Sequence, residues 1–155
     1  KALAAHPVAF AADYDRTEAD PAEAWVERIR RYEANQEGVI CLAAAQDGLV
    51  GMTGLVRGHW PKTQHSAFIW GVYVTAAWRG NGIAGALLEA CIDWGRAHGV
   101  TLVKLGVVTT NTPAIRCYAR CGFVVYGIEP QVISHGGVLY DELLMARVIE
   151  PPRGS

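Results

Sequence analysis

A glycine-rich turn is the segment of this chain whose residue types and spacing best suit chemistry. It reads Arg79-Gly80-Asn81-Gly82-Ile83-Ala84-Gly85 and joins an expected strand to an expected helix. Glycines at such a junction expose consecutive backbone N–H groups without interference from a Cβ, and the helix dipole adds about half a positive charge there. The turn is therefore suited to bind a pyrophosphate. The plainer interpretation is a tight turn, but two glycines followed by Ala84 and Gly85 exceed what a turn requires.

The nature of the pyrophosphate ligand depends on what surrounds the turn. Gly80, Gly82 and Gly85 satisfy the GxGxxG pattern of dinucleotide-binding folds. That fold needs an acid at the end of the next strand, and Leu105 to Thr109 contains none. The preceding strands are expected to form hairpins rather than a βαβ unit, and the Gly-Lys-Ser/Thr of a P-loop is absent. The sequence therefore disfavours a nicotinamide dinucleotide and excludes a P-loop.

Cysteines and histidines are not spaced as metal ligands. The nearest two of the four cysteines lie four residues apart, as on one helix face, and the five histidines show no HxH or HExxH spacing. We expect no metal site. We also expect four free thiols in a reducing cytoplasm, at Cys41, Cys91, Cys117 and Cys121.

Composition bounds the class of protein. The 155 residues are 51% apolar and 19% charged, which supplies one buried core and excludes a disordered chain. The net charge of −1 argues against binding nucleic acid by bulk charge. No apolar run approaches the roughly 18–20 residues of a membrane span, so we expect neither a nucleic-acid nor a membrane partner. We expect one domain over residues 1–150 and a tail over 151–155.

The sequence around the turn predicts a mixed sheet flanked by helices, and these elements must position the turn. Asp20-Pro21-Ala22-Glu23 is expected to open a helix that Gly38 ends, and Asp47-Gly48 to close a hairpin. A glycine inside the third strand, Gly71, indicates a bulge or a close backbone approach. The expected strands are Val39–Gln46, Leu49–Arg57, Ser66–Thr75, Thr101–Thr109, Phe123–Ile128 and Val138–Val148, and the later helices are Gly82–His98 and Pro113–Arg120.

Two motifs resemble the signatures of the GNAT superfamily of acetyl-CoA-dependent N-acetyltransferases. Arg79 to Ala84 matches the pattern Arg/Gln-x-x-Gly-x-Gly/Ala. Asn111 to Phe123 resembles the second signature, with an Asn, an Ala, a Tyr and a Gly-Phe at its spacings, and Tyr140 to Met145 looks like the closing strand. The resemblance covers nearly all of the chain, and two signatures in the right element order are specific.

The resemblance implies a fold and a cofactor site. The fold is α/β (α+β), with a mostly antiparallel mixed sheet in which two parallel strands splay apart, flanked by helices. Pantetheine would lie between the strand ending at Thr75 and the strand starting near Thr101. The implied acetyl-CoA-binding residues are Val72, Tyr73, Val74, Arg79, Gly80, Asn81, Gly82, Ile83, Ala84, Gly85, Asn111, Ala114, Cys117 and Tyr118.

The implied reaction is attack of a primary amine on the thioester carbonyl, with no metal. A backbone N–H of the strand before the turn would stabilise the developing oxyanion. The Tyr118 hydroxyl would protonate the departing thiolate. The alternative is a non-catalytic acyl-CoA-binding or regulatory module on the same fold, which would bind the cofactor without turnover.

The general base is left open by the sequence. Some family members place a Glu on the strand before the second signature, where this chain has Gly106, and no acid lies between Val100 and Cys121. A water chain or an amine of low pKa would remove the need for one. The candidate side chains elsewhere are His59, His65, Glu129, His135 and Asp141.

The acceptor and the assembly are equally open. Aromatic residues could wall an acceptor pocket, with the loop around Trp60 as its rim, and acids near the first helices could attract a cationic amine. A family member normally begins with a strand ahead of the first helix, and we expect Lys1 to lie inside that helix, so the strand is trimmed, disordered or supplied by residues outside this numbering. Its absence would leave an open edge at Val39–Gln46 and favour a homodimer. The aromatic candidates are Trp60, Trp70, Tyr73 and Tyr140, and the acids are Asp13, Asp15 and Glu18.

Overall fold

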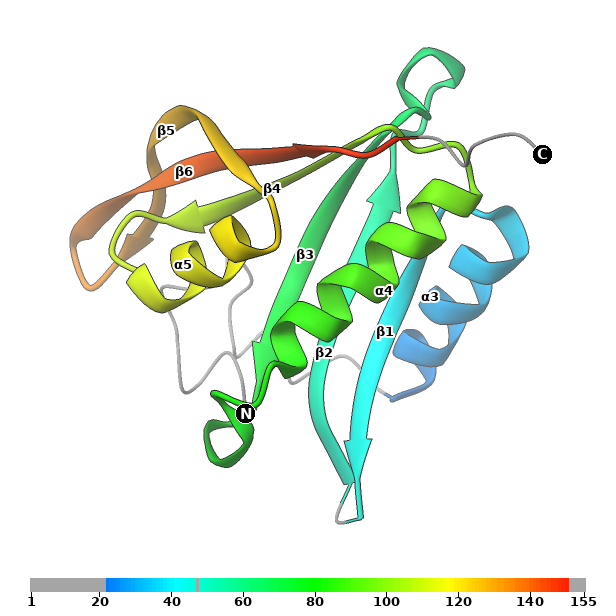
Figure 1. The fold of residues 1–155 in the computed structure, drawn as a ribbon, viewed down its shortest axis with the longest axis horizontal. Coiled ribbons are helices and arrows are strands. Elements are labelled where there is room, and N and C mark those ends of the chain that lie inside the picture. Colours follow the sequence, from blue (N-terminus) through cyan, green and yellow to red (C-terminus); the bar gives the residue numbers. More distant parts are fainter. Residues whose placement is uncertain (1–21, 47, 151–155) are drawn as a thin grey trace.

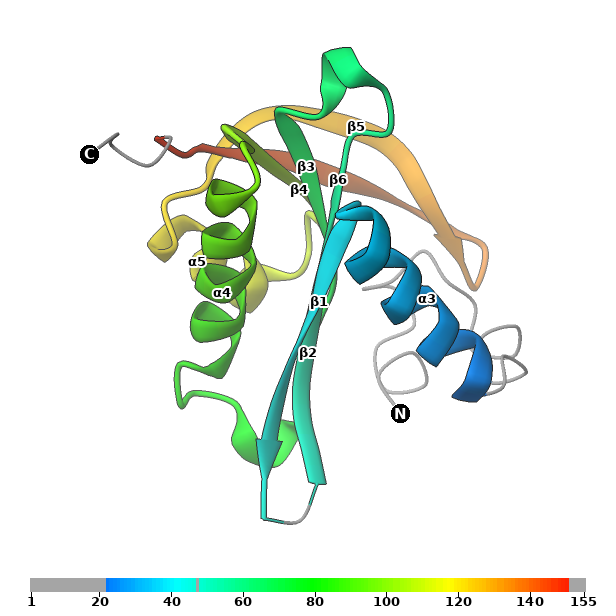
Figure 2. The same cartoon turned by 90° about the vertical axis from the view of Figure 1, so that its right-hand side faces the viewer.

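The structure, a computed structural model, describes residues 22–46 and 48–150. These form a six-stranded sheet in the order β1-β2-β3-β4-β6-β5. Helices α4 and α5 cover one face, and α3 lies on the other beside β1 (Figures 1 and 2). The bounds are α3 Ala22–Asn35, β1 Gly38–Ala45, β2 Gly48–Arg57, β3 Ser66–Val74, α4 Ile83–Ala97, β4 Leu102–Val108, α5 Thr112–Arg120, β5 Val124–His135 and β6 Val138–Val148.

The sheet opens between β3 and β4, its one parallel pair. The two strands are paired only at their beginnings, from Ser66 opposite Leu102 to Phe68 opposite Lys104. Beyond Phe68, β3 keeps its antiparallel partner β2, and β4 keeps its antiparallel partner β6 over its whole length. The two strands therefore diverge toward their carboxyl ends, as Figure 1 shows.

A bulge in β3 accompanies this divergence. Gly71 has φ +66°, and the register with β2 shifts between Met52 and Gly54, opposite Tyr73 and Trp70. A bulge bends its strand and increases the local twist, and a left-handed φ at that position favours glycine. The bulge expected from the sequence is therefore confirmed, and it lies where β3 turns away from β4.

The core lies between the sheet and the face bearing α4 and α5. Alternate side chains of β4 point into it, whereas Lys104 and Gly106 belong to the opposite face. Helix α4 contributes a stripe at helical spacing, and α5 contributes Tyr118. The most deeply buried side chains include Leu55, Leu88, Cys91, Ile92, Val100, Val103, Leu105 and Met145.

The fold class expected from the sequence is confirmed, with two local corrections. Helix α3 is not ended by Gly38: it ends at Asn35, and Gln36 takes the left-handed conformation with φ +54°. Gly38 instead opens β1, where a Cβ would collide with the backbone oxygen of Leu55, so close strand approach explains the glycine.

Strand β5 is longer than expected. The sequence predicted an end at Ile128, two residues before Pro130. The structure continues β5 to His135 through a register irregularity between Glu129 and Ile133, where Gln131 has φ +56° and its N–H donates to Asp141 Oδ1 at 2.8 Å.

Several expectations lie outside the described residues. They are the helix opening at Asp20-Pro21, the acids Asp13, Asp15 and Glu18, the expected absence of a first strand and the tail over 151–155. Among the residues that the structure describes, no helix is long and apolar enough to cross a membrane.

Candidate active site

The glycine turn lies where β3 ends and α4 begins. Gly80 and Gly82 have φ +79° and +76°, and a Cβ on either would meet nothing within 4 Å, so the space around the turn is open. Gly82 caps α4 without a side-chain hydrogen bond, and the N–H of Ala86 donates to its carbonyl at 3.0 Å. The amides of Ile83 to Gly85 precede that bond and have no acceptor within the helix. They form a site for an anion at the positive end of the helix dipole.

Two polar side chains shape this turn. Arg79 Nε donates to the carbonyl of Val74 at 3.0 Å, which ties the turn to the last residue of β3. Asn81 Nδ2 donates to the carbonyl of Trp78 at 3.2 Å. Both side chains therefore stabilise the backbone between β3 and α4 by donating hydrogen bonds to carbonyl groups of that same segment.

The edge of β3 beyond the bulge presents backbone groups to the opening. The N–H of Thr75 donates to the carbonyl of Val50 in β2 at 2.8 Å, so the other side of that peptide, the carbonyl of Val74, points away from β2. Because backbone groups alternate along a strand, those of Val72 and Val74 face the opening, while those of Tyr73 face Met52 in β2.

Helix α5 borders the opening from the end of β4. Asn111 caps it, with Oδ1 accepting the N–H of Ala114 at 3.4 Å, and this uses only the oxygen of the amide, so its NH₂ still offers two donors. Ala114 and Cys117 pack partly against the core, and Tyr118 is buried with its ring edge toward Phe123. Burial, with a smaller contribution from Cys117 and Cys121, raises the pKa of Tyr118 well above its ordinary value.

The two predicted signature motifs are brought together in the fold. An added Cβ at Gly85 in α4 would lie 3.7 Å from Cys121 Sγ at the end of α5, so the two helices contact each other closely. Arg147 of β6 pairs with Glu89 of α4 and donates to the carbonyl of Cys121 at 2.7 Å. The turn, the β3 edge and α5 thus surround one opening.

Sequence reasoning missed one residue of this region, Glu142 of β6. A Cβ added to Gly106 would collide with Glu142 Oε2 and lie 3.2 Å from Cδ, so the carboxylate covers Gly106. Burial, and then the carboxylate of Glu129 opposite it in β5, raise the pKa of Glu142 above its ordinary value. The signal was present only in the pairing of β4 with β6, which no spacing in the sequence reveals.

Except for Glu129, which lies opposite Glu142, the other candidates for a base do not gather at this opening. His59 and His65 flank the β2–β3 connection, at the far end of β3 from the turn, and His135 lies beside the β5–β6 turn. Asp141 accepts the N–H of Gln131. Glu129 is exposed and lies opposite Glu142.

The aromatic candidates are also spread out. Trp60 is 70% exposed, and it too lies at the β2–β3 connection. The ring of Trp70 covers Gly54, where a Cβ would overlap it. Tyr73 and Tyr140 are half-buried on β3 and β6. Trp60 is therefore separated from the turn by the whole length of β3.

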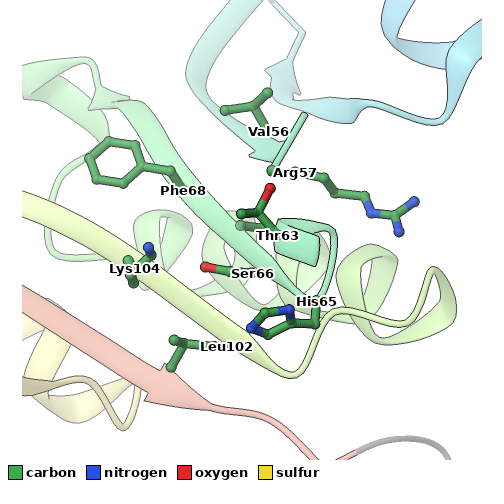
Figure 3. Close-up of a pocket in the computed structure, with 10 residues that line it drawn as sticks. Val56, Arg57, Thr63, His65, Ser66, Phe68, Leu102 and Lys104 are labelled. Atoms are coloured by element: carbon green, nitrogen blue, oxygen red, sulfur yellow. The ribbon is translucent and has the colours of Figure 1, made fainter. Parts of the chain in front are cut away.

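A cavity of about 350 Å³ lies at the closed end of the strand pair (Figure 3). It is bordered by Ser66, Phe68 and Lys104, at the positions where β3 and β4 are still paired. A second, more apolar hollow of about 480 Å³ lies between β1 and α4, beside Cys41. The second hollow is lined by Ile83 of the turn, but neither is lined by α5 or by the part of β3 beyond the bulge, so the candidate site rests on the splayed strands and open amides.

The chain is similar to known acetyltransferases. Residues 7–123 match the model of the Acetyltransferase (GNAT) family. The chain is 33% identical over 129 residues to L-amino acid N-acetyltransferase AaaT of Escherichia coli strain K12, covering 80% of this chain and 75% of that protein. Further curated relatives are matched over 25% to 63% of their own length.

Solved structures share the fold. A GNAT-family acetyltransferase from Streptococcus pneumoniae superposes with a TM-score of 0.78 at 21% identity, covering 85% of this chain and 78% of that one. The yncA protein of Salmonella typhimurium, solved with its cofactor acetyl-CoA, superposes with a TM-score of 0.70 at 23% identity, covering 83% and 76%.

Proposed function

This chain belongs to the GNAT acetyltransferase family, and from that premise we propose that it transfers an acetyl group from acetyl-CoA to the primary amine of an amino-acid-like acceptor. Attack takes place directly, in a ternary complex. The proposal rests on one observation. The strands β3 and β4 separate from each other, and the gap is bordered by the open amides of the glycine turn on one side and by α5 on the other. The E. coli relative, named for L-amino acids, supports the acceptor class.

The residues of the turn fit the pyrophosphate of acetyl-CoA. The amides of Ile83, Ala84 and Gly85 are open at the helix N-terminus, and Gly80 and Gly82 leave room for close approach. Arg79 and Asn81 hold the turn in shape. The pantetheine arm lies between β3 and β4, where the free NH₂ of Asn111 and the surface of Ala114 and Cys117 border it.

The chain's own groups then support the chemistry. Acetyl-CoA supplies a thioester whose carbonyl carbon accepts the amine and whose sulfur departs as a thiolate. A backbone N–H of Val72 or Val74 stabilises the charge that develops on the carbonyl oxygen, worth about 2.7–4 kcal/mol for one good donor. Tyr118, whose pKa is raised, keeps its proton at neutral pH and donates it to the sulfur.

The free thiols of this chain indicate the cellular compartment in which we propose that it acts. The four cysteines are unpaired, which fits a reducing compartment, and we place the enzyme in the cytoplasm. Its partner in the reaction is the amine acceptor. We include in the proposal a homodimer through β1, which is an edge strand of the sheet that the described residues form.

Release of the CoA thiol tests the proposed function. Purified protein, acetyl-CoA and each proteinogenic L-amino acid are combined, with polyamines, aminoglycosides and N-terminal peptides as other acceptor classes. Thiol release stimulated by one or more amino acids is the expected result. Stimulation by another class alone would correct the acceptor, and tight acetyl-CoA binding without release by any amine would favour a non-catalytic acyl-CoA-binding module.

A further inference from the structure

We propose that Glu142 of β6 is the general base of this enzyme, taking the proton from the acceptor amine at the position where Gly106 leaves β4 without a side chain. This inference rests on the proposed function, because it names the group that prepares the amine for that reaction. Neither motif of the sequence contains the residue.

The pairing of β4 with β6 carries the carboxylate to that position. Glu142 is directly opposite Val108, and Gly106 is opposite Leu144, so Glu142 reaches Gly106 diagonally across the two strands. A Cβ at Gly106 would collide with Oε2 of Glu142, so the carboxylate fills the space that any side chain at Gly106 would need. The glycine at position 106 of β4 therefore makes room for the carboxylate of Glu142 from β6.

The carboxylate lies on the correct face of the sheet for an acceptor. Val103, Leu105 and Val107 of β4 point into the core beneath α4 and α5. Side chains alternate along a strand, so Gly106, with Glu142 above it, belongs to the opposite face. The turn and α5 occupy the first face, and an amine that approaches the opening from the second meets Glu142.

The surroundings of Glu142 make it a stronger base than an exposed carboxylate. Burial and the facing Glu129 of β5 raise its pKa, and efficient bases have pKa values close to the working pH. Within the described part of the chain, Lys104 of β4 lies two residues before Gly106 and Tyr140 of β6 lies two residues before Glu142 on this face, and Tyr73 of β3 lies on the same face across the opening. Asp141 is bonded to Gln131 and is not available.

The step balances without any further reactant. An N–H bond of the ammonium breaks, and its proton goes to Glu142. The amine lone pair forms the N–C bond to the acetyl carbon, the C–S bond breaks, and Tyr118 protonates the sulfur. A second N–H proton leaves the nitrogen as the intermediate collapses to the amide and passes through solvent to the phenolate of Tyr118, while Glu142 releases its proton to solvent. The products are the N-acetylated acceptor and CoA, and solvent exchange restores both side chains.

The test uses the amino acid that the wild-type chain acetylates fastest. Glu142→Gln is expected to lower kcat by about 10²-fold or more, with the Kd for acetyl-CoA unchanged. The loss should shrink above the pKa of the amine, where the acceptor is already deprotonated. Asp141→Asn, the neighbouring carboxylate on the strand, is the control and should retain activity within a few-fold.

Two further variants separate a base from a structural role. Gly106→Ala places a methyl group where the carboxylate lies, in an ordinary extended strand, and should lower kcat although Glu142 is intact. Glu129→Gln should move the acid limb of the pH–rate profile to lower pH without changing its plateau. Glu142→Ala combined with Gly106→Glu, which returns a carboxylate to the same space from β4, should recover part of the activity.

Each outcome separates the two proposals. Full activity of Glu142→Gln with an unchanged pH profile would overturn the base while leaving the acetyltransferase intact. A wild-type chain that binds acetyl-CoA and acetylates no amine would overturn the proposed function, and the base with it.

Discussion

Two side chains, Tyr118 and Glu142, carry the protons of the proposed reaction, and their surroundings shift both pKa values upward. The consequence is opposite for the two groups. A phenol with a raised pKa stays protonated at neutral pH and serves as a donor. A carboxyl group with a raised pKa becomes a stronger base. In the proposed reaction, burial therefore favours Tyr118 as the acid and Glu142 as the base.

Removing the Tyr118 hydroxyl should slow the chemical step without affecting binding. Tyr118→Phe keeps the ring that packs beside Phe123 but leaves the thiolate without a donor. We expect kcat to fall about tenfold or more, with an unchanged Kd for acetyl-CoA, measured by thiol release and calorimetry. Tyr126→Phe, at an exposed tyrosine of β5, is the matched control. Equal rates for both variants would remove Tyr118 from the mechanism.

We also expect Glu142 to lower the stability of the folded chain at neutral pH. Its folded-state pKa lies above the unfolded value, so the folded chain binds the proton more tightly. The associated stability is complete below the unfolded pKa, near 4.3, and is lost as pH rises through the folded pKa. Glu142→Gln should therefore melt at a higher temperature than wild type at pH 7, and the difference should diminish toward pH 4. A lower melting temperature at pH 7 would contradict the direction of the shift.

At the scale of elements, α4 offers a matched comparison because a left-handed glycine stands at each end. Gly82 and Gly99 have φ +76° and +78°, and a Cβ on either meets nothing within 4 Å. An alanine should cost each about 1–2 kcal/mol of stability. Gly82→Ala should in addition weaken acetyl-CoA binding, because it disturbs the open amides, whereas Gly99→Ala should not. Titration calorimetry with chemical denaturation measures both effects, and equal affinities would place the pyrophosphate elsewhere.

Local signals predicted most elements and part of the site. The glycine inside β3 indicated a bulge, and the two motifs fell on the ends of α4 and α5 that the fold brings into contact. Strand β5 is longer than predicted because its pairing with β6 resumes after an irregularity between Glu129 and Ile133, where Gln131 is left-handed, and no spacing in the sequence signals this. Glu142 was missed because its meeting with Gly106 depends on the register between two strands, and register is a property of the folded sheet.

At the scale of the whole molecule, the sheet separates two tasks. One face of the sheet bears α4 and α5 (Figure 2) and holds the turn and the core. The opposite face holds Glu142 above Gly106. The opening between β3 and β4 connects them, so two substrates can meet without competing for the same surface. This arrangement requires α4, α5 and β6 to keep fixed positions relative to one another.

Arg147 is the side chain that ties those three elements together. It extends from β6, pairs with Glu89 of α4 and donates to the carbonyl of Cys121 at the end of α5. Its side chain is 22% exposed, so water screens these bonds less than at the surface. Arg147→Met should lower the free energy of unfolding by about 1–3 kcal/mol and weaken acetyl-CoA binding, because the two helices flanking the turn lose their common support.

An ion pair within a single helix provides the comparison for this tie. Arg96 pairs with Asp93 along α4 and contacts no second element through that bond. Exposed pairs at this spacing contribute about 0.5 kcal/mol or less, so Arg96→Met should leave both stability and cofactor affinity nearly unchanged. Urea denaturation and acetyl-CoA titration of the two variants decide the matter. If Arg147→Met destabilised the chain without lowering affinity, the opening would be held by β3 and β4 themselves rather than by the helices that border it.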